Sequence, residues 1–281
     1  MPARDAQRRA DAAAATFDAA DFVPAHTRLA LLERLAPMLV DASVVVDLGT
    51  ATGAAYRLLA GRFRGARVIG VDLALNMLRA ARAKQRWRAK QRFVQADATR
   101  LPFADQSVDV VYANLLLPWI RDPAALFAEV NRVLRPGGLL AFSTLGPDSL
   151  AELRQAWRHV DGLGRQSPFP DMHDLGDDAV RSGLADPVLD VERLSVTYRD
   201  ATSLFADLSA IGARGIGPAR RRGLVGRETR AALLDALDAY RAGALLRFEL
   251  ELVYGHCWGS GRSAGAGEFH ISPAGIPRRR G

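Results

Sequence analysis

Short apolar runs alternate with amphipathic segments over residues 43–144 of this chain. The runs predict strands at Ser43–Leu48, Arg67–Asp72, Arg92–Ala96, Ser107–Ala113 and Leu139–Thr144. The segments between them predict helices at Tyr56–Phe63, Asn76–Trp87 and Asp122–Arg135. Alternation of this kind is typical of an α/β fold, in which a mostly parallel sheet has right-handed crossovers and helices on both faces.

The alternation changes after Gly146. Two further strands are predicted at Val188–Tyr198 and Phe248–Tyr254, and helices at Ser149–Val160, Asp177–Gly183, Thr202–Ile211 and Glu228–Tyr240. The two strands complete a seven-stranded sheet, and the inserted helices form a lid suited to substrate recognition. We predict one structural domain with an N-terminal helical cap (1–42), a cofactor-binding core (43–146) and a C-terminal part with the insertion and a basic tail (147–281).

Cysteine content and hydropathy limit where the protein works. The single cysteine, Cys257, rules out an internal disulfide and gives no metal cluster. No apolar run approaches the roughly 20 residues that a membrane-spanning helix requires. Residues 1–21 alternate Ala with Arg and Asp and contain no apolar signal core. We therefore expect a cytoplasmic protein without a resident metal or a membrane partner.

Positive charge is unevenly distributed along the chain, whose formal net charge is +7. The segment from Arg79 to Arg92 contains basic residues and no acid, and its members are Arg79, Arg82, Lys84, Arg86, Arg88, Lys90 and Arg92. A solvated helix face is one interpretation of this cluster. A docking surface for an acidic macromolecule, either nucleic acid or an acidic carrier protein, is the other.

A glycine-rich turn follows the first predicted strand, in the segment Asp47-Leu-Gly49-Thr-Ala51-Thr-Gly53. Glycines at such a turn let the backbone pass close to a bound nucleotide, with a helix N-terminus behind it. Asp72 ends the second predicted strand nineteen residues after Gly53. A carboxylate at that position can accept hydrogen bonds from both ribose hydroxyls. The pattern indicates an adenosine cofactor.

Two acidic residues refine this prediction. Asp97 follows the third predicted strand, where a carboxylate can accept a hydrogen bond from an adenine amino group, although a plain capping role fits that position equally well. Asp47 would repel the pyrophosphate of a dinucleotide and attract the ammonium of a methionyl tail. Ala51 also stands where a dinucleotide site prefers glycine. The predicted cofactor is therefore S-adenosyl-L-methionine.

Several motifs of the first half resemble class I methyltransferases. They are Val45–Gly49, Val71–Asp72, Gln95–Ala98, Leu101–Phe103, Ser107–Val110 and Glu129–Gly138. The resemblance implies a Rossmann-like fold and a cofactor site at the carboxyl ends of the strands. The predicted cofactor-binding residues are Asp47, Gly49, Ala51, Gly53, Asp72, Leu73, Asp97, Ala98 and Asn114.

A narrower resemblance spans most of the chain. The segments Phe142–Arg154, Asp174–Asp177, Asp186–Asp190, Leu194–Tyr198, Val253–Trp258 and Ile276–Arg280 resemble malonyl-[acyl-carrier protein] O-methyltransferases of biotin synthesis. That family esterifies the free carboxylate of a malonyl thioester. The resemblance implies a malonyl-carrying acyl carrier protein as partner and makes nucleic acid the less favoured one. By complementary charge, we expect the carrier protein to dock on Arg79, Arg82, Arg86 and Arg88.

The resemblance also implies roles at the acceptor site. Arg154 is predicted to hold the malonyl carboxylate through charge-assisted hydrogen bonds, and Phe17 to close the pocket over the thioester. The chain departs from the family pattern at Ala51, at Phe17 and at Pro118, where glycine, tyrosine and glutamine are usual. The last two departures bear on the substrate.

Two alternatives stay open at this point. The C-terminal motifs also resemble a mitochondrial complex I assembly factor, which keeps the methyltransferase fold and is thought to hydroxylate arginine. A protein that binds cofactor or RNA without catalysis is the other alternative, because the basic clusters permit RNA binding. Turnover of S-adenosylmethionine to S-adenosylhomocysteine separates the methyltransferase from both.

Overall fold

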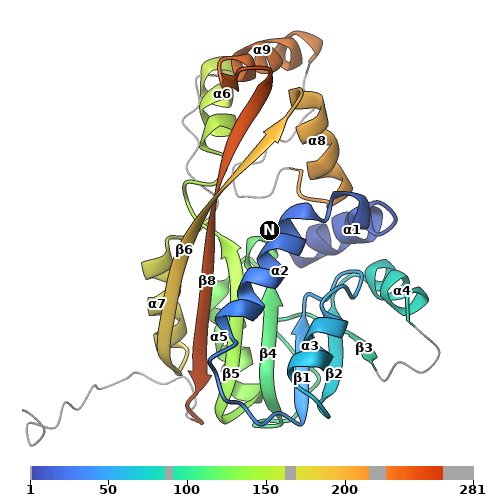
Figure 1. Cartoon of the computed structure of the whole chain (residues 1–281), viewed down its shortest axis with the longest axis vertical. Coiled ribbons are helices and arrows are strands. Elements are labelled where there is room, and N and C mark those ends of the chain that lie inside the picture. The colour runs from blue at the N-terminus through green and yellow to red at the C-terminus, as the bar shows by residue number, and fades with distance from the viewer. Residues whose placement is uncertain (1, 86–90, 162–168, 215–225, 262–281) are drawn as a thin grey trace, which may run out of the picture.

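The computed structural model describes residues 2–85, 91–161, 169–214 and 226–261 (Figure 1). One sheet of eight strands organises them, in the order β3-β2-β1-β4-β5-β8-β6, with β7 paired to β8. The strands are β1 (Val44–Leu48), β2 (Arg67–Asp72), β3 (Arg92–Gln95), β4 (Val108–Asn114), β5 (Leu134–Leu145), β6 (Leu184–Tyr198), β7 (Arg241–Ala242) and β8 (Leu245–Gly259).

Strands β1 to β5 are mutually parallel, and we call them the parallel part of the sheet. β8 runs antiparallel to both β5 and β6. The predicted α/β fold with a largely parallel sheet is thus confirmed. The predicted number of strands, seven, is wrong by one, because the two-residue strand β7 pairs with the start of β8.

Helices cover both faces of the sheet. They are α1 (Ala3–Ala13), η1 (Phe17–Ala20), α2 (Phe22–Arg34), α3 (Tyr56–Arg62), α4 (Leu75–Ala83), η2 (Leu117–Trp119), α5 (Pro123–Val133), α6 (Ala151–Asp161), α7 (Met172–Arg181), α8 (Ala201–Ala210) and α9 (Arg227–Asp238). Helices α2 and α3 pack on one face, and α5 and α7 pack on the other.

The two faces follow from the alternation of side chains along each strand. Val45 and Val110 point into the core under α2 and α3, whereas their neighbours Val46 and Val111 point into the core under α5. All four side chains are fully buried. Burial on both faces explains why these strands are continuous apolar runs in the sequence.

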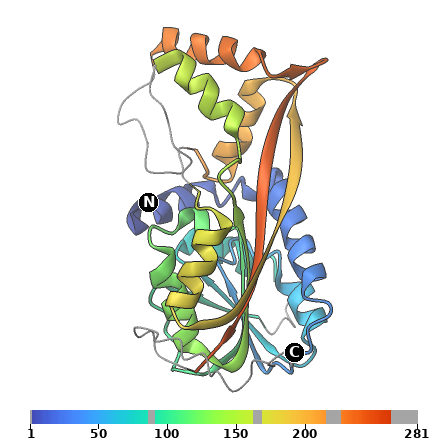
Figure 2. The same cartoon turned by 90° about the vertical axis from the view of Figure 1, so that its left-hand side faces the viewer.

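The antiparallel strands β6 and β8 are each 15 residues long and form what we call the β6–β8 ribbon. The ribbon extends beyond the parallel part of the sheet and carries α6, α8 and α9 at its far end (Figures 1 and 2). These three helices pack against the outer half of the ribbon through Ala156, Leu204, Leu237 and Phe248. The ribbon therefore supports a helical lobe beside the parallel part.

Several predicted boundaries differ from those observed. Helix α7 begins at Met172, five residues before the predicted start, because Asp171 caps it by accepting a hydrogen bond from the His173 N–H. Strand β6 begins at Leu184 instead of Val188, and its register shifts between Ala185 and Val188. This irregularity contains Pro187, which has no N–H to donate to a sheet ladder.

None of the described helices is long and apolar enough to cross a membrane.

Candidate functional site

A cavity of about 570 Å³ opens at the carboxyl ends of β1, β2 and β4. The sheet order reverses between β1 and β4, and ligands of open α/β sheets bind at such a switch point. The volume lies within the range of pockets that bind small molecules. Of the predicted cofactor-binding residues, those that line it are Asp47, Gly49, Ala51, Asp72, Leu73, Asp97, Ala98 and Asn114.

The turn after β1 brings backbone close to this cavity. Gly49, Ala51 and Gly53 all have positive φ, at +75°, +46° and +78°. Glycine adopts this conformation freely, whereas alanine is strained in it, so Ala51 costs about 1 kcal/mol or more at this turn. Gly53 does not line the cavity. A side chain there would meet the Cβ atom of Ala81 on α4 at 3.0 Å.

Asp47 is the most deeply buried acid of the cavity wall, with 2% of its surface exposed. Its Oδ2 atom accepts a hydrogen bond of 2.5 Å from the Thr50 hydroxyl. Burial raises the pKa of Asp47 to about 6, against the opposing effects of Thr50 and of Arg28. A buried carboxylate of this kind is stabilised by a cationic ligand group, which suits an ammonium.

Asp72 ends β2 and is held in place by two backbone groups. Oδ2 accepts a hydrogen bond from the Ala51 N–H at 2.9 Å, and Oδ1 accepts one from the Ala74 N–H at 2.8 Å. Burial raises the pKa of this carboxyl group, and these hydrogen bonds oppose the rise. Each oxygen has a second lone pair available to a ligand hydroxyl, so the geometry fits recognition of a ribose diol.

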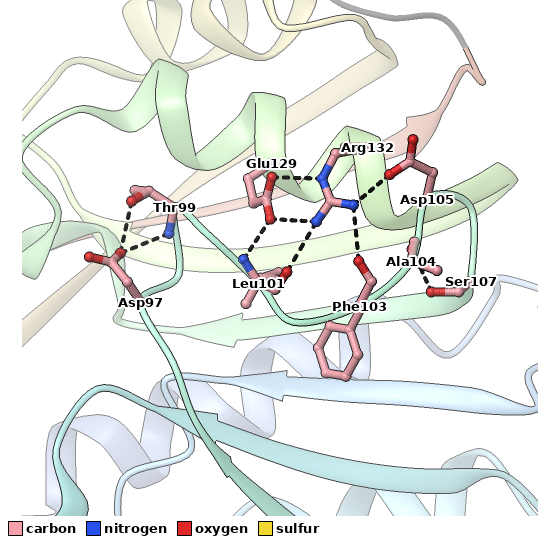
Figure 3. Close-up of polar contacts among 9 residues, drawn as sticks. All are labelled: Asp97, Thr99, Leu101, Phe103, Ala104, Asp105, Ser107, Glu129 and Arg132. Carbon is pink, nitrogen blue, oxygen red and sulfur yellow. Dashed lines mark hydrogen bonds and ion pairs between the residues drawn. The ribbon is translucent and has the colours of Figure 1, made fainter.

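Asp97 begins the loop between β3 and β4 (Figure 3). Its Oδ1 atom accepts hydrogen bonds from the Thr99 N–H at 2.9 Å and the Thr99 hydroxyl at 2.8 Å. The local capping role considered from the sequence is therefore present. Within the described chain Oδ2 has no hydrogen-bond partner, and Asp97 lines the cavity, so the same residue can also meet a ligand.

Two residues of α5, Glu129 and Arg132, hold the loop that follows Asp97 (Figure 3). Glu129 accepts a hydrogen bond from the Leu101 N–H at 2.5 Å. Arg132 donates to the carbonyl oxygens of Leu101 and Phe103 at 3.1 and 2.9 Å. Although burial alone would raise it, the pKa of Glu129 is lowered by hydrogen bonds from Arg132 and Leu101. The sequence motif contained both residues, but their anchoring role emerges only from the structure.

The N-terminal segment closes another side of the cavity. Phe17 of η1 lines it, as do residues of α1. The neighbouring Asp18 accepts a hydrogen bond of 2.6 Å from the Thr52 hydroxyl and pairs with Lys84, the residue that follows α4. Asn114 donates to the Pro24 carbonyl at 3.0 Å, which fixes α2 against the end of β4. The predicted position of Phe17 beside the pocket agrees with this geometry.

Arg154 does not line the cavity. It lies on α6, and its guanidinium donates to the carbonyl oxygens of Ser149 and, at 2.7 Å, of Pro147. Burial lowers the pKa of Arg154. The side chain thus fixes the loop that connects β5 to α6. Direct contact with a malonyl carboxylate stays a prediction for this residue.

The arginines that line the cavity, among the described residues, are Arg28 and Arg121. Arg28 was not predicted as a site residue. It belongs to an amphipathic helix whose sequence contains a second arginine, Arg34, on the same element. No local motif distinguishes the two, and only the tertiary structure brings Arg28 to the cavity.

The predicted docking residues are only partly described. Arg79 and Arg82 are exposed on α4, and Arg86 and Arg88 lie outside the described residues. Helix α1 packs against α4 and also lines the cavity. Arg4 and Arg8 of α1 are also exposed, and Arg8 pairs with Asp5 at 3.2 Å.

A family model described as a methyltransferase domain matches residues 46–142. The malonyl-[acyl-carrier protein] O-methyltransferase of Laribacter hongkongensis is 41% identical over 278 residues, covering 96% of this chain and 89% of the relative. The enzyme of the same name from Gallionella capsiferriformans is 40% identical over 252 residues, covering 88% of this chain and 87% of the relative.

Solved structures agree in fold. The YcgJ protein from Bacillus subtilis has a TM-score of 0.58 at 16% identity, covering 83% of this chain and 98% of that chain. A phosphoethanolamine N-methyltransferase of Haemonchus contortus, in complex with S-adenosyl-L-methionine, has a TM-score of 0.51 at 22% identity, covering 83% of this chain and 52% of that chain.

These findings confirm the predicted enzyme class, an S-adenosylmethionine-dependent methyltransferase. Two relatives with about 40% identity match this chain over nearly all of its length and theirs. The chain belongs to the malonyl-[acyl-carrier protein] O-methyltransferase family.

Proposed function

We propose that this chain transfers a methyl group from S-adenosyl-L-methionine to the free carboxylate of a malonyl thioester on acyl carrier protein, in early biotin synthesis. The observation that carries the proposal is the near full-length similarity to malonyl-[acyl-carrier protein] O-methyltransferases. The cavity supports it with acids at the ends of neighbouring strands.

The cofactor fits the donor groups of the cavity wall. Asp47 binds the methionyl ammonium, Asp72 the ribose hydroxyls and Asp97 the adenine amino group. Leu73, Ala98 and Asn114 complete the wall. Residues of the Gly49–Gly53 turn line the same cavity and would contact the methionyl part. When bound, S-adenosylmethionine supplies a methyl group made electrophilic by its sulfonium.

The acceptor needs little chemical activation. A carboxyl group is already ionised near neutral pH, so its oxygen can attack the methyl group without a general base. The chain must instead position that oxygen in line and exclude water. Phe17 and the apolar side of α1, with Ala3, Ala6 and Ala10, supply an apolar wall suited to this task.

Arg154 acts on the acceptor side in this proposal. It fixes the Pro147–Ser149 loop after β5, whose neighbour Leu145 lines the cavity. Direct binding of the malonyl carboxylate by this guanidinium stays a prediction. Replacing Arg154 is therefore expected to raise the KM for the malonyl substrate more than it weakens cofactor binding.

Acyl carrier protein is acidic, and we assign its docking to the basic surface formed by Arg4, Arg8, Arg79 and Arg82. Complementary charge accelerates and orients such encounters. The double variant Arg79→Glu and Arg82→Glu is expected to raise the KM for malonyl-acyl carrier protein several-fold and to leave the reaction with malonyl-coenzyme A nearly unchanged. Arg230→Glu, an exposed position on α9, is the matched control. An equal increase in KM for malonyl-acyl carrier protein and for malonyl-coenzyme A would contradict the docking assignment.

The proposed reaction is tested by incubating the protein with methyl-labelled S-adenosylmethionine and malonyl-acyl carrier protein. A labelled methyl ester on the acyl group, absent with Asp47→Ala, is the expected result. Labelled methyl on another acceptor, or oxygen-dependent hydroxylation of arginine without cofactor turnover, overturns the proposal. The expected cytoplasmic location stays a prediction.

A further inference from the structure

Arg28 combines burial with unused hydrogen-bonding capacity. Only 12% of its side chain is exposed, and its Nη2 atom donates to Asp21 Oδ2 at 2.8 Å. A guanidinium carries five N–H donors in a fixed plane. Within the described part of the chain, the bond to Asp21 is the one hydrogen bond that this guanidinium makes. The remaining donors belong to a side chain that lines the cavity, so they are available to an anionic ligand.

The backbone around Arg28 is fixed without any ligand. The Tyr112 hydroxyl donates to the Arg28 carbonyl oxygen at 3.0 Å. One turn earlier, Asn114 donates to the Pro24 carbonyl. Both donors belong to β4, the strand beside β1. Arg28 is therefore held at a set place relative to the strand end that carries Asp47.

Arg28 and Asp47 line the same cavity. The guanidinium lowers the pKa of Asp47, opposing the larger effect of burial, so the two charges interact. The cavity wall also carries Asp72 and Asp97. Arg28 is thus the buried cation, among the described residues, in a wall dominated by carboxylates.

An α-amino acid group carries an ammonium and a carboxylate on the same carbon atom. A site that recognises both charges needs an anion and a cation within one cavity, and Asp47 and Arg28 line the same cavity. We propose that Arg28 binds the α-carboxylate of S-adenosylmethionine while Asp47 binds its α-ammonium, an inference that rests on the proposed cofactor site. The pair makes the cavity selective for nucleosides with an intact amino acid end.

The test compares S-adenosylmethionine with decarboxylated S-adenosylmethionine, which keeps the ammonium and lacks the carboxylate. Equilibrium binding is measured by calorimetry without any acceptor. The wild-type protein is expected to prefer the intact cofactor by about 10-fold to 100-fold, the value of a charge-assisted contact. Arg28→Gln is expected to remove that preference by weakening only the intact cofactor. Arg28→Lys is expected to restore part of that preference, because lysine carries the positive charge but lacks the planar guanidinium group.

Arg121→Gln is the matched control, since Arg121 also lines the cavity but is exposed. It is expected to keep the preference. Equal weakening of both ligands by Arg28→Gln would show that Arg28 only holds α2 in place. Unchanged affinity for both would show that it serves another anion, such as the acceptor. Either result overturns the assignment of Arg28 to the α-carboxylate and leaves the proposed cofactor site in place. If neither ligand binds the wild-type protein, the proposed cofactor site fails as well.

Discussion

The parallel part of the sheet and the β6–β8 ribbon differ in the length of their strands and in where those strands end. Strands β1 to β4 have between 4 and 7 residues, and β1, β2 and β4 end at the cavity. Each strand of the ribbon has 15 residues and extends beyond the parallel part of the sheet to the helices α6, α8 and α9 (Figure 1).

The difference separates two tasks. In the parallel part, short buried strands bring Asp47 and Asp72 to one edge, because parallel strands end together. In the ribbon, length and twist decide where Arg154 and the helical lobe lie relative to that edge. We infer that the parallel part binds the cofactor and that the ribbon with its helices adapts the site to the acceptor.

The largest expected effect falls in the parallel part. Asp47→Asn keeps the size of the side chain but removes the charge that faces the ammonium, so affinity for S-adenosylhomocysteine is expected to fall about 100-fold or more. The melting temperature is expected to stay unchanged or rise, because burial disfavours the ionised carboxylate. Calorimetric titration and thermal unfolding measure the two quantities. A variant that binds normally contradicts the assignment.

The junction between the two regions gives the next largest effect. Gly255 of β8 faces Phe142 of β5, and an added Cβ atom would lie 2.3 Å from the buried Phe142 ring. Gly255→Ala is expected to lower the free energy of unfolding by about 1–3 kcal/mol through overpacking. The control is Gly61→Ala on α3, where an added Cβ meets nothing within 4 Å. Denaturant unfolding of both variants checks the prediction, and equal stability would contradict the packing.

The pH dependence of cofactor binding sharpens the role of Asp47. The raised pKa of about 6 means that the ligand-free carboxyl becomes protonated as pH falls through that value. Affinity for S-adenosylhomocysteine is therefore expected to be about tenfold weaker at pH 5 than at pH 7. The folding stability of the ligand-free protein changes in the opposite direction. Asp47 contributes stability at low pH, and that contribution is lost as pH rises from about 4 to 6. A pH profile that is as steep in Asp47→Asn as in the wild type would assign the titration to another group.

The smallest effect is expected where the ribbon meets α2 at the surface. Arg34 donates three hydrogen bonds to Asp190, at 3.0, 2.9 and 2.6 Å, but the side chain of Asp190 is 54% exposed. Solvent screening limits such a pair to about 0.2–1 kcal/mol. A double-mutant cycle with Arg34→Ala and Asp190→Ala is expected to give a coupling energy in that range, decreasing at high salt. A coupling of several kcal/mol would mean that this contact, and not the packing, joins the ribbon to α2.

The parallel part and most of its site could be predicted from the sequence. The starts and ends of β1 and β2 follow from apolar runs that end at Asp47-Leu-Gly49 and at Asp72. The order of these strands was therefore enough to predict that both acids lie at the same edge of the sheet. The start of β6 was missed because Asp186-Pro187 is typical of a turn, whereas the sheet absorbs it as an irregularity at its edge.

Long-range contacts account for the other differences. Arg154 was expected at the pocket, but its guanidinium reaches backbone carbonyl oxygens of its own loop. Arg28 lies on a different element from Asp47, and both line one cavity because Tyr112 and Asn114 hold α2 against β4. Side-chain direction on an amphipathic helix does not follow from a local motif.

The division between the two regions is tested most directly by comparing Asp47→Asn with Arg154→Gln. For both variants we would measure the Kd for S-adenosylhomocysteine and the KM for malonyl-acyl carrier protein. We predict that Asp47→Asn loses cofactor affinity, whereas Arg154→Gln keeps it within about threefold and raises the KM of the acceptor. A loss of cofactor affinity in Arg154→Gln equal to that in Asp47→Asn would contradict the division.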